Sequence, residues 1–237
     1  MTRSAGRIVF ADNPWPRGHR IERAVWSGRI DDRGLWFDLH VESARYDEDD
    51  DVRAAAGDGS DEDVVDPPGG DWAAKAVWGN YHRCSLSSTK WRCDGGFLVG
   101  TAEQRFDWAD LAGQRFAVDP LPSTRATTAQ LPRAAGDDQP EPAFNIYLLG
   151  HDTVGGHRLR FTPGRGGARI DWEARIALTY AGDQRFIHRL TAHIDAARFE
   201  GFRAVDGLPP DVASDLLAVF TTDPSVYRRR GTAFVPA

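Results

Sequence analysis

Apolar and polar residues alternate along much of the chain, most regularly between residues 168 and 194. A period of two is typical of a strand with one buried face. We expect two strands here, joined through residues 181–183, because this turn brings both apolar series onto the same face. A shift of one residue would bury charged side chains, so the register is well defined. The residues expected to point inward are Ile170, Trp172, Ala174, Ile176, Leu178, Tyr180, Phe186, His188, Leu190, Ala192 and Ile194.

A second hairpin with the same pattern covers residues 20–30 and 35–46. The Asp-Asp-Arg-Gly sequence between them suits a type I turn whose last residue is left-handed. Closing this turn with Ile30 opposite Leu35 again collects the apolar residues on one face. The second hairpin therefore repeats the pattern of the first, although the two segments are far apart in the chain.

Two hairpins that each bury a single face indicate an all-β fold, either a two-sheet antiparallel β-sandwich or a flattened barrel. The convincing helix is at residues 209–220, where two prolines suit the first turn and an apolar stripe follows. That stripe consists of Val212, Leu216, Val219 and Phe220. The remaining strands are expected at residues 8–10, 72–83, 97–99, 104–106, 114–118, 144–149, 158–162 and 197–202, with one helical turn at 107–111.

The chain has 237 residues, 41% of them hydrophobic, which is enough for one buried core. We therefore expect a single domain over residues 1–237, interrupted by an acidic surface loop at 47–71 and a Pro-rich surface loop at 119–143. The acidic loop has too little apolar area to offset the entropy lost on ordering. No apolar run reaches the length of a signal peptide or a membrane helix, so we expect a soluble cytoplasmic protein with no membrane partner.

Acidic residues are concentrated in one part of the chain. Residues 45–71 hold eleven acids and two bases, a net charge of −9, whereas the whole chain carries −6 and the remainder therefore +3. A nucleic-acid-binding protein usually has a concentrated basic face, which this sequence lacks, so we expect no nucleic-acid partner. The acidic loop could instead attract a basic protein partner, in an association that weakens as salt rises.

The densest group of polar residues lies near residues 80–93. His82 and Cys84 are two positions apart, which on a strand places them on one face within contact distance. One hypothesis is a hydrolase-type enzyme with Cys84 as the nucleophile and His82 as the base. The alternative is structural, with Cys84 opposite Cys93 across a turn. We favour the structural interpretation because the sequence identifies neither an orienting acid nor oxyanion donors.

Two groups of residues have the chemistry of metal ligands. Asp38, His40 and Glu42 share one strand face, and His151, Asp152 and His157 flank a Gly-Gly turn. Simpler explanations exist for both groups, since Glu42 falls opposite Arg23 in the expected hairpin and turn chemistry accounts for Asp152. We therefore expect no metal and no cofactor, with the second group as the weak metal candidates.

Eight tryptophans are many for this length, and some are expected at the surface. Exposed aromatic rings suit stacking on sugars or contact with a protein. A separate feature is the expected register of the first hairpin, which sets Arg175 directly opposite Arg189, and such like-charged pairs destabilise a sheet unless a neighbour compensates. Glu173, diagonal to Arg189, is the expected compensation, and an anion site is the alternative. The candidate binding residues are Asn80, Tyr81, Trp36, Trp91, Arg175 and Arg189.

These observations favour a non-catalytic binding or protein-interaction domain over an enzyme. Its partner is expected to be another protein or a small polar ligand. Two alternatives stay open. One is the hydrolase with a Cys/His site near residues 80–93, and the other is a lectin-like binder of a sugar or small polar ligand that uses Trp36 or Trp91.

Overall fold

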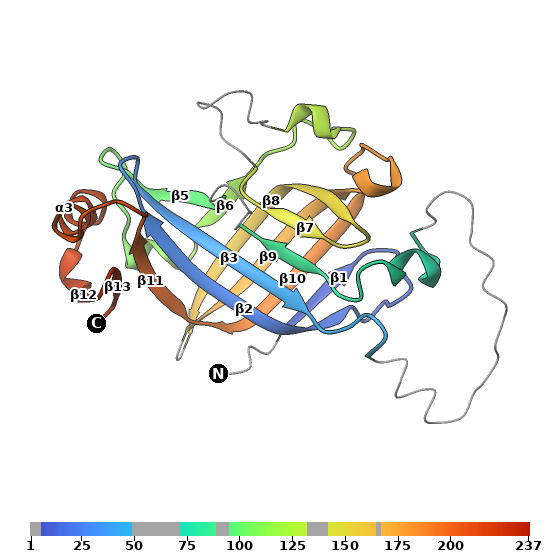
Figure 1. Cartoon of the computed structure of the whole chain (residues 1–237), viewed down its shortest axis with the longest axis horizontal. Helices are drawn as coiled ribbons and strands as arrows, with labels where there is room; N and C mark the ends of the chain where they lie inside the picture. The colour runs from blue at the N-terminus through green and yellow to red at the C-terminus, as the bar shows by residue number, and fades with distance from the viewer. Residues whose placement is uncertain (1–5, 49–71, 89–94, 132–141, 165–166) are drawn as a thin grey trace.

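The computed structural model describes residues 6–48, 72–88, 95–131, 142–164 and 167–237. It confirms the all-β class, with 49% of the described residues in strands and 15% in helices. Within the described ranges, thirteen strands form one hydrogen-bonded sheet (Figure 1). Most of the acidic loop (49–71), part of the Pro-rich loop (132–141), Trp91 and Cys93 lie outside these ranges.

Eight antiparallel strands close into a barrel. The ring closes because β1 pairs with both β2 and β10, while the short strands β4 and β7 connect β3 to β8. Of the two architectures expected, the structure has the barrel, and a sandwich is not confirmed. Around the ring the strands are β1 (Gly6–Phe10), β2 (His19–Ile30), β3 (Leu35–Ser43), β4 (Ser85–Ser87), β7 (Asn145–Tyr147), β8 (His151–Gly164), β9 (Gly167–Ala177) and β10 (His188–Ala197).

Five further strands extend the barrel wall. They are β5 (Phe97–Gly100) beside β3, β6 (Arg115–Val118) beside β8, β11 (Phe199–Ala204) parallel to β2, β13 (Ala233–Pro236) beside β11, and β12 (Tyr227–Arg230) at the edge. The helical segments are α2 (Trp108–Leu111), α3 (Pro210–Phe220) and the 3-10 turns η1 (Lys75–Gly79), η2 (Thr128–Gln130), η3 (Thr179–Ala181) and η4 (Pro224–Val226). No helix in the described part of the chain is long and apolar enough to cross a membrane.

The register of both hairpins is confirmed. Ile30 lies opposite Leu35 in the β2–β3 pair, and Arg175 lies opposite Arg189 in the β9–β10 pair. The expected inward direction is wrong for Tyr180, whose side chain is exposed (63%). Strand β9 ends at Ala177 and the chain turns away into η3, so the alternation no longer sets the direction of later side chains.

Aromatic side chains fill the barrel. The ring of Phe161 on β8 lies 4.9 Å from Trp26 on β2 and 5.6 Å from Phe37 on β3, so side chains from opposite walls meet at the centre. Phe144 and Trp172 make a similar contact at 4.5 Å. A ligand site is therefore expected in a groove on the outside of the wall.

Several expected elements differ in the structure. Residues 72–83 form turns and η1 rather than a strand, because Trp72 and Trp78 pack on each other with ring centroids 4.8 Å apart. Residues 104–106 contribute only an isolated bridge between Phe106 and Thr221.

The C-terminal helix is confirmed at Pro210–Phe220, but its buried stripe differs from the expected one. Helix α3 buries Ala213, Leu217 and Phe220, and it leaves Val212 and Val219 exposed. Strands β12 and β13, which follow it, were not expected from the sequence.

Strand β8 begins at His151, seven residues before the expected start at 158. His151, Asp152 and His157 therefore lie along a strand and do not flank a turn. The glycine pair between them is a bulge, where the β8–β9 register shifts between Gly155 and Arg158.

Candidate functional site

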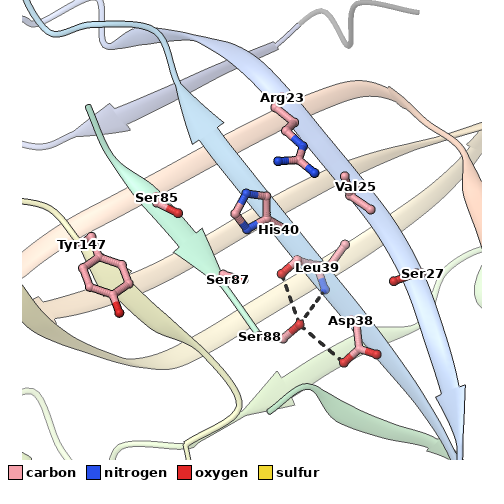
Figure 2. A pocket seen from close by; sticks show the side chains of 10 residues that line it. All are labelled: Arg23, Val25, Ser27, Asp38, Leu39, His40, Ser85, Ser87, Ser88 and Tyr147. Carbon is pink, nitrogen blue, oxygen red and sulfur yellow. Dashed lines mark hydrogen bonds between the residues drawn. The ribbon is translucent and has the colours of Figure 1, made fainter. Parts of the chain in front are cut away.

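Two polar grooves lie on opposite walls of the barrel. The arginine groove, of about 660 Å³, runs over β8, β9 and β10 and contains Arg158, Arg175, Arg189 and Glu173. The polar groove, of about 480 Å³, runs over β2, β3, β4 and β7 (Figure 2). In Figure 1 the strands β2 and β3 lie in front of β9 and β10, and the strand order of the ring places them on opposite sides.

Strand register builds the floor of the arginine groove. Arg175 faces Arg189 across the β9–β10 pair, and Glu173 lies between Arg158 on β8 and Thr191 on β10. Cβ atoms of directly opposite residues are about 5 Å apart, so both guanidinium groups can reach one ligand. The bulge in β8, between Gly155 and Arg158, changes which side chains of the strand point outward. Arg158 therefore faces the same groove as Arg175 and Arg189.

The arginine groove carries excess positive charge. Within the described residues, neither Arg158, Arg189 nor Glu173 forms an ion pair, and Arg175 Nη1 only donates a 3.4 Å hydrogen bond to the carbonyl of Phe186. Three cations and one carboxylate give the groove a formal charge of +2 in a chain whose total is −6. A bound anion would relieve the repulsion between Arg175 and Arg189.

The segment between β6 and η2 forms one wall of the arginine groove. The amide of Gly156 donates to the Asp119 carbonyl at 2.7 Å, and the amide of Phe186 donates to the Ala126 carbonyl at 3.1 Å. Leu121 packs against a small apolar cluster that consists of Ala126 from the same segment, Leu131, Ala177 and Phe186. These contacts hold the wall in place without a ligand.

The buried ring of His157 lies next to the arginine groove, on its core side. The indole of Trp172 donates to Nδ1 of His157 at 3.1 Å, so the proton of the neutral ring is on Nε2. Nε2 is buried without a hydrogen-bond partner, since the nearest carboxylate oxygen, Oδ2 of Asp119, is 3.8 Å away. Burial lowers the pKa of His157 to about 3, and at that distance Asp119 does not offset the effect. The ring is therefore neutral at pH 7.

The polar groove is built from outward side chains of four neighbouring strands. Figure 2 shows His40 near the centre, with Ser85 and Ser87 of β4 on one side and Arg23 of β2 on the other. Register explains this arrangement, because His40 pairs with Ser87 across β3 and β4. Tyr147 of β7 extends the groove beyond β4, since it pairs with Ser85.

Ser88 closes one end of the polar groove. Its hydroxyl accepts a hydrogen bond from the Leu39 amide at 3.0 Å and lies 3.4 Å from Oδ1 of Asp38. Both contacts are drawn in Figure 2. They fix Asp38 of β3 and Ser88 relative to each other.

The structure does not bring His82 and Cys84 together as a reactive pair. Cys84 is a free thiol that is completely buried, whereas His82 is exposed. Burial raises the pKa of Cys84, and the negative charge of Asp152 adds to this effect. A thiol that is buried and protonated is a poor nucleophile. The proposed partner Cys93 lies outside the described residues.

The candidate binding residues near residue 80 have structural contacts. Asn80 donates a 2.7 Å hydrogen bond to the Leu149 carbonyl. The ring of Tyr81 lies 5.9 Å from that of Tyr147, so it borders the polar groove without lining it.

Trp36 contacts charged groups of its own chain. The guanidinium carbons of Arg29 and Arg33 lie 4.6 Å and 4.8 Å from its ring centroid, and its indole donates to Asp31 at 2.9 Å. Trp36 lines neither groove, but it lines a third one, of about 540 Å³, beside β5 and β6. Trp91, the other candidate for sugar stacking, lies outside the described residues.

The candidate metal ligands do not converge. His151 is exposed, whereas Asp152 is buried and accepts hydrogen bonds from the amides of Leu149, Gly150 and Tyr180. No group of three potential ligands suited to a metal occurs among the residues that the structure describes. In the other candidate group, which consists of Asp38, His40 and Glu42, the carboxylate of Glu42 contacts both Arg23 and His40.

Sequence reasoning identified Arg175 and Arg189 but missed Arg158, Ser85 and Tyr147. Only the bulge at Gly155–Gly156 gives a sequence signal, because paired glycines inside an alternating segment indicate a change of phase. Ser85 and Tyr147 join the polar groove through pairing of distant short strands, for which the sequence has no local signal. Comparison of the chain with protein-family models, curated proteins and solved structures gave no match.

Proposed function

We propose that this protein is a non-catalytic binding protein that holds a small organic anion in the arginine groove. The observation that supports this proposal is the position of Arg175 directly opposite Arg189, with Arg158 in the same groove. Natural sheets rarely keep such pairs without compensation, because each costs stability. A ligand that carries a carboxylate or a phosphate would supply the compensation.

The chemistry of the groove suits such a ligand. Guanidinium groups bind carboxylates and phosphates through two parallel hydrogen bonds. Hydroxyl groups of Ser123, Thr124 and Thr191 line the same space and can donate to further oxygens. Leu121 supplies an apolar wall for the carbon part of the ligand. The volume of about 660 Å³ falls in the usual range of small-molecule sites.

The hydrolase alternative has weaker support. It needs an accessible thiolate at Cys84, and that side chain is inside the barrel. Binding without catalysis requires only the groove and its charges. We therefore propose binding without catalysis, and the positive charge of the arginine groove indicates an anionic ligand.

Calorimetric titration with inorganic phosphate, citrate and benzoate tests the proposal. We expect at least one of these anions to bind, with an affinity that falls as sodium chloride is added. Arg189→Gln should weaken binding about tenfold, since it removes a charge-assisted hydrogen bond. Arg228→Gln, on the exposed edge strand β12, is the matched control and should bind like the unmodified protein.

Two results would overturn the assignment. One is the absence of binding by all three anions at about 10 mM. The other is equal affinity of the Arg189→Gln and Arg228→Gln variants, which would show that any anion binds elsewhere.

A further inference from the structure

The polar groove differs from the arginine groove in its charge balance. Arg29 Nη1 lies 2.8 Å from Oδ1 of Asp38, so these two charges neutralise each other. Glu42 Oε1 lies 2.7 Å from Nε2 of His40 and 3.7 Å from Nη1 of Arg23. The charged groups in and around the groove are thus paired with one another. A charged ligand would gain little there, because it would have to compete with these internal pairs.

Three hydroxyl groups in the groove are open. Those of Ser27 on β2, Ser85 on β4 and Tyr147 on β7 have no hydrogen-bond partner in the described ranges, and all three line the groove (Figure 2). Strands β4 and β7 are hydrogen-bonded to each other, and β3 lies between β2 and β4. Each can both donate and accept a hydrogen bond.

The ring of Tyr147 is held in place. His151 packs edge-on against it with centroids 4.5 Å apart, and Tyr81 does so from 5.9 Å. A fixed ring presents its hydroxyl at a defined position, which lowers the entropy cost of binding a ligand there. Tyr81 and His151, both singled out in the sequence, thereby position a side chain of the groove.

We propose that the polar groove is a second binding site, for a neutral polyhydroxyl ligand such as a short saccharide. Hydroxyl groups of a saccharide donate and accept hydrogen bonds in the same way as the three open hydroxyls. The paired charges around His40 and Asp38 add fixed polar groups without net charge. This site is on the opposite wall from the arginine groove, so either one can exist without the other.

NMR titration of the ¹⁵N-labelled full chain with maltotriose, cellotriose, mannotriose and chitotriose tests this site. We expect at least one trisaccharide to shift the amide signals of β3 and β4. Tyr147→Phe removes one hydroxyl and keeps the ring, and Ser85→Ala removes another. Each should weaken binding about three- to tenfold, the effect of one neutral hydrogen bond.

Two control variants make the test specific. Tyr180→Phe removes a hydroxyl from a ring that is 63% exposed and outside the groove, and it should leave the affinity unchanged. Arg175→Gln should also leave it unchanged, which separates this site from the arginine groove. The proposal fails if no trisaccharide shifts the groove signals at about 10 mM, or if Tyr147→Phe and Tyr180→Phe bind equally well.

Discussion

The indole Nε1–H of Trp172 donates a hydrogen bond to Nδ1 of His157 across 3.1 Å inside the barrel. This bond fixes which ring nitrogen carries the proton, and it is possible only while Nδ1 is unprotonated. Phe144 packs against both rings, at 4.5 Å from Trp172 and 4.7 Å from His157. The neutral imidazole is therefore part of the core, and its protonation is coupled to unfolding.

Stability should fall in acid because of His157. Burial lowers its pKa in the folded state to about 3, whereas the value for an ordinary histidine is 6.5. Between these limits the unfolded chain binds the proton and the folded chain does not. The contribution of His157 to the free energy of unfolding is therefore full above about pH 6.5. Below that pH it falls by up to about 1.4 kcal/mol per pH unit.

Urea denaturation between pH 4 and 7 checks this prediction by comparing the chain with its His157→Gln variant. Glutamine can accept the Trp172 hydrogen bond and does not titrate, so the variant should lose less stability over this range. His82→Gln, at an exposed position, controls for the loss of a histidine in general. Parallel pH profiles for the unmodified chain and His157→Gln would rule out the coupling.

The pair Arg175–Arg189 should cost stability when no ligand is bound. Directly opposite like charges in a sheet destabilise by a few tenths of a kcal/mol to about 1 kcal/mol. Arg189→Gln should therefore raise the free energy of unfolding by about 0.5 kcal/mol at low salt, and less at high salt. Chemical denaturation in anion-free buffer measures this change. A loss of stability would mean that Arg189 has a favourable partner in the folded state.

The two hairpins could be predicted because everything that defines them is local. In residues 168–194 the alternation and the turn agree, and only one register buries the apolar series. The same reasoning failed for residues 72–83. Trp72 and Trp78 are buried there as the pattern suggests, but the chain between them is the turn η1. A period of two among large aromatic residues does not distinguish a strand from a compact turn packed against the core.

Closure of the barrel and both grooves depend on contacts that the sequence does not encode locally. His40 meets Ser87 only because β3 pairs with β4, which is more than forty residues later in the chain. Arg158 joins the arginine groove only because of the bulge at Gly155–Gly156. Two of the three arginines that line the arginine groove could be placed together from the sequence, because Arg175 and Arg189 share a hairpin, whereas Arg158 comes from a different strand pair.

Gly156 should matter for both stability and anion binding. Its φ is +64°, and a Cβ there would lie 3.0 Å from Cδ1 of Leu121 in the groove wall. Gly156→Ala should lower the free energy of unfolding by about 1 kcal/mol through backbone strain. It should also weaken phosphate or carboxylate binding, because the added methyl group displaces Leu121.

Gly231 provides the matched control for this substitution. Its φ is +61°, and nothing lies within 4 Å of an added Cβ. Gly231→Ala should therefore show a similar loss in urea denaturation and no change in anion affinity. If both variants bind anions like the unmodified chain, the wall formed by Leu121 is not part of the site.

Cys84 should react with thiol reagents only when the chain unfolds. The side chain is completely buried, and burial, with the charge of Asp152, raises its pKa, so neither access nor thiolate is available in the native state. Labelling by a disulfide reagent, followed in a Cys93→Ser background, should be slow in buffer and should accelerate with denaturant. His82→Ala should leave the rate unchanged, because His82 is exposed and Cys84 is inside the barrel. Rapid stoichiometric labelling in buffer that depends on His82 would instead favour the hydrolase hypothesis over a binding protein.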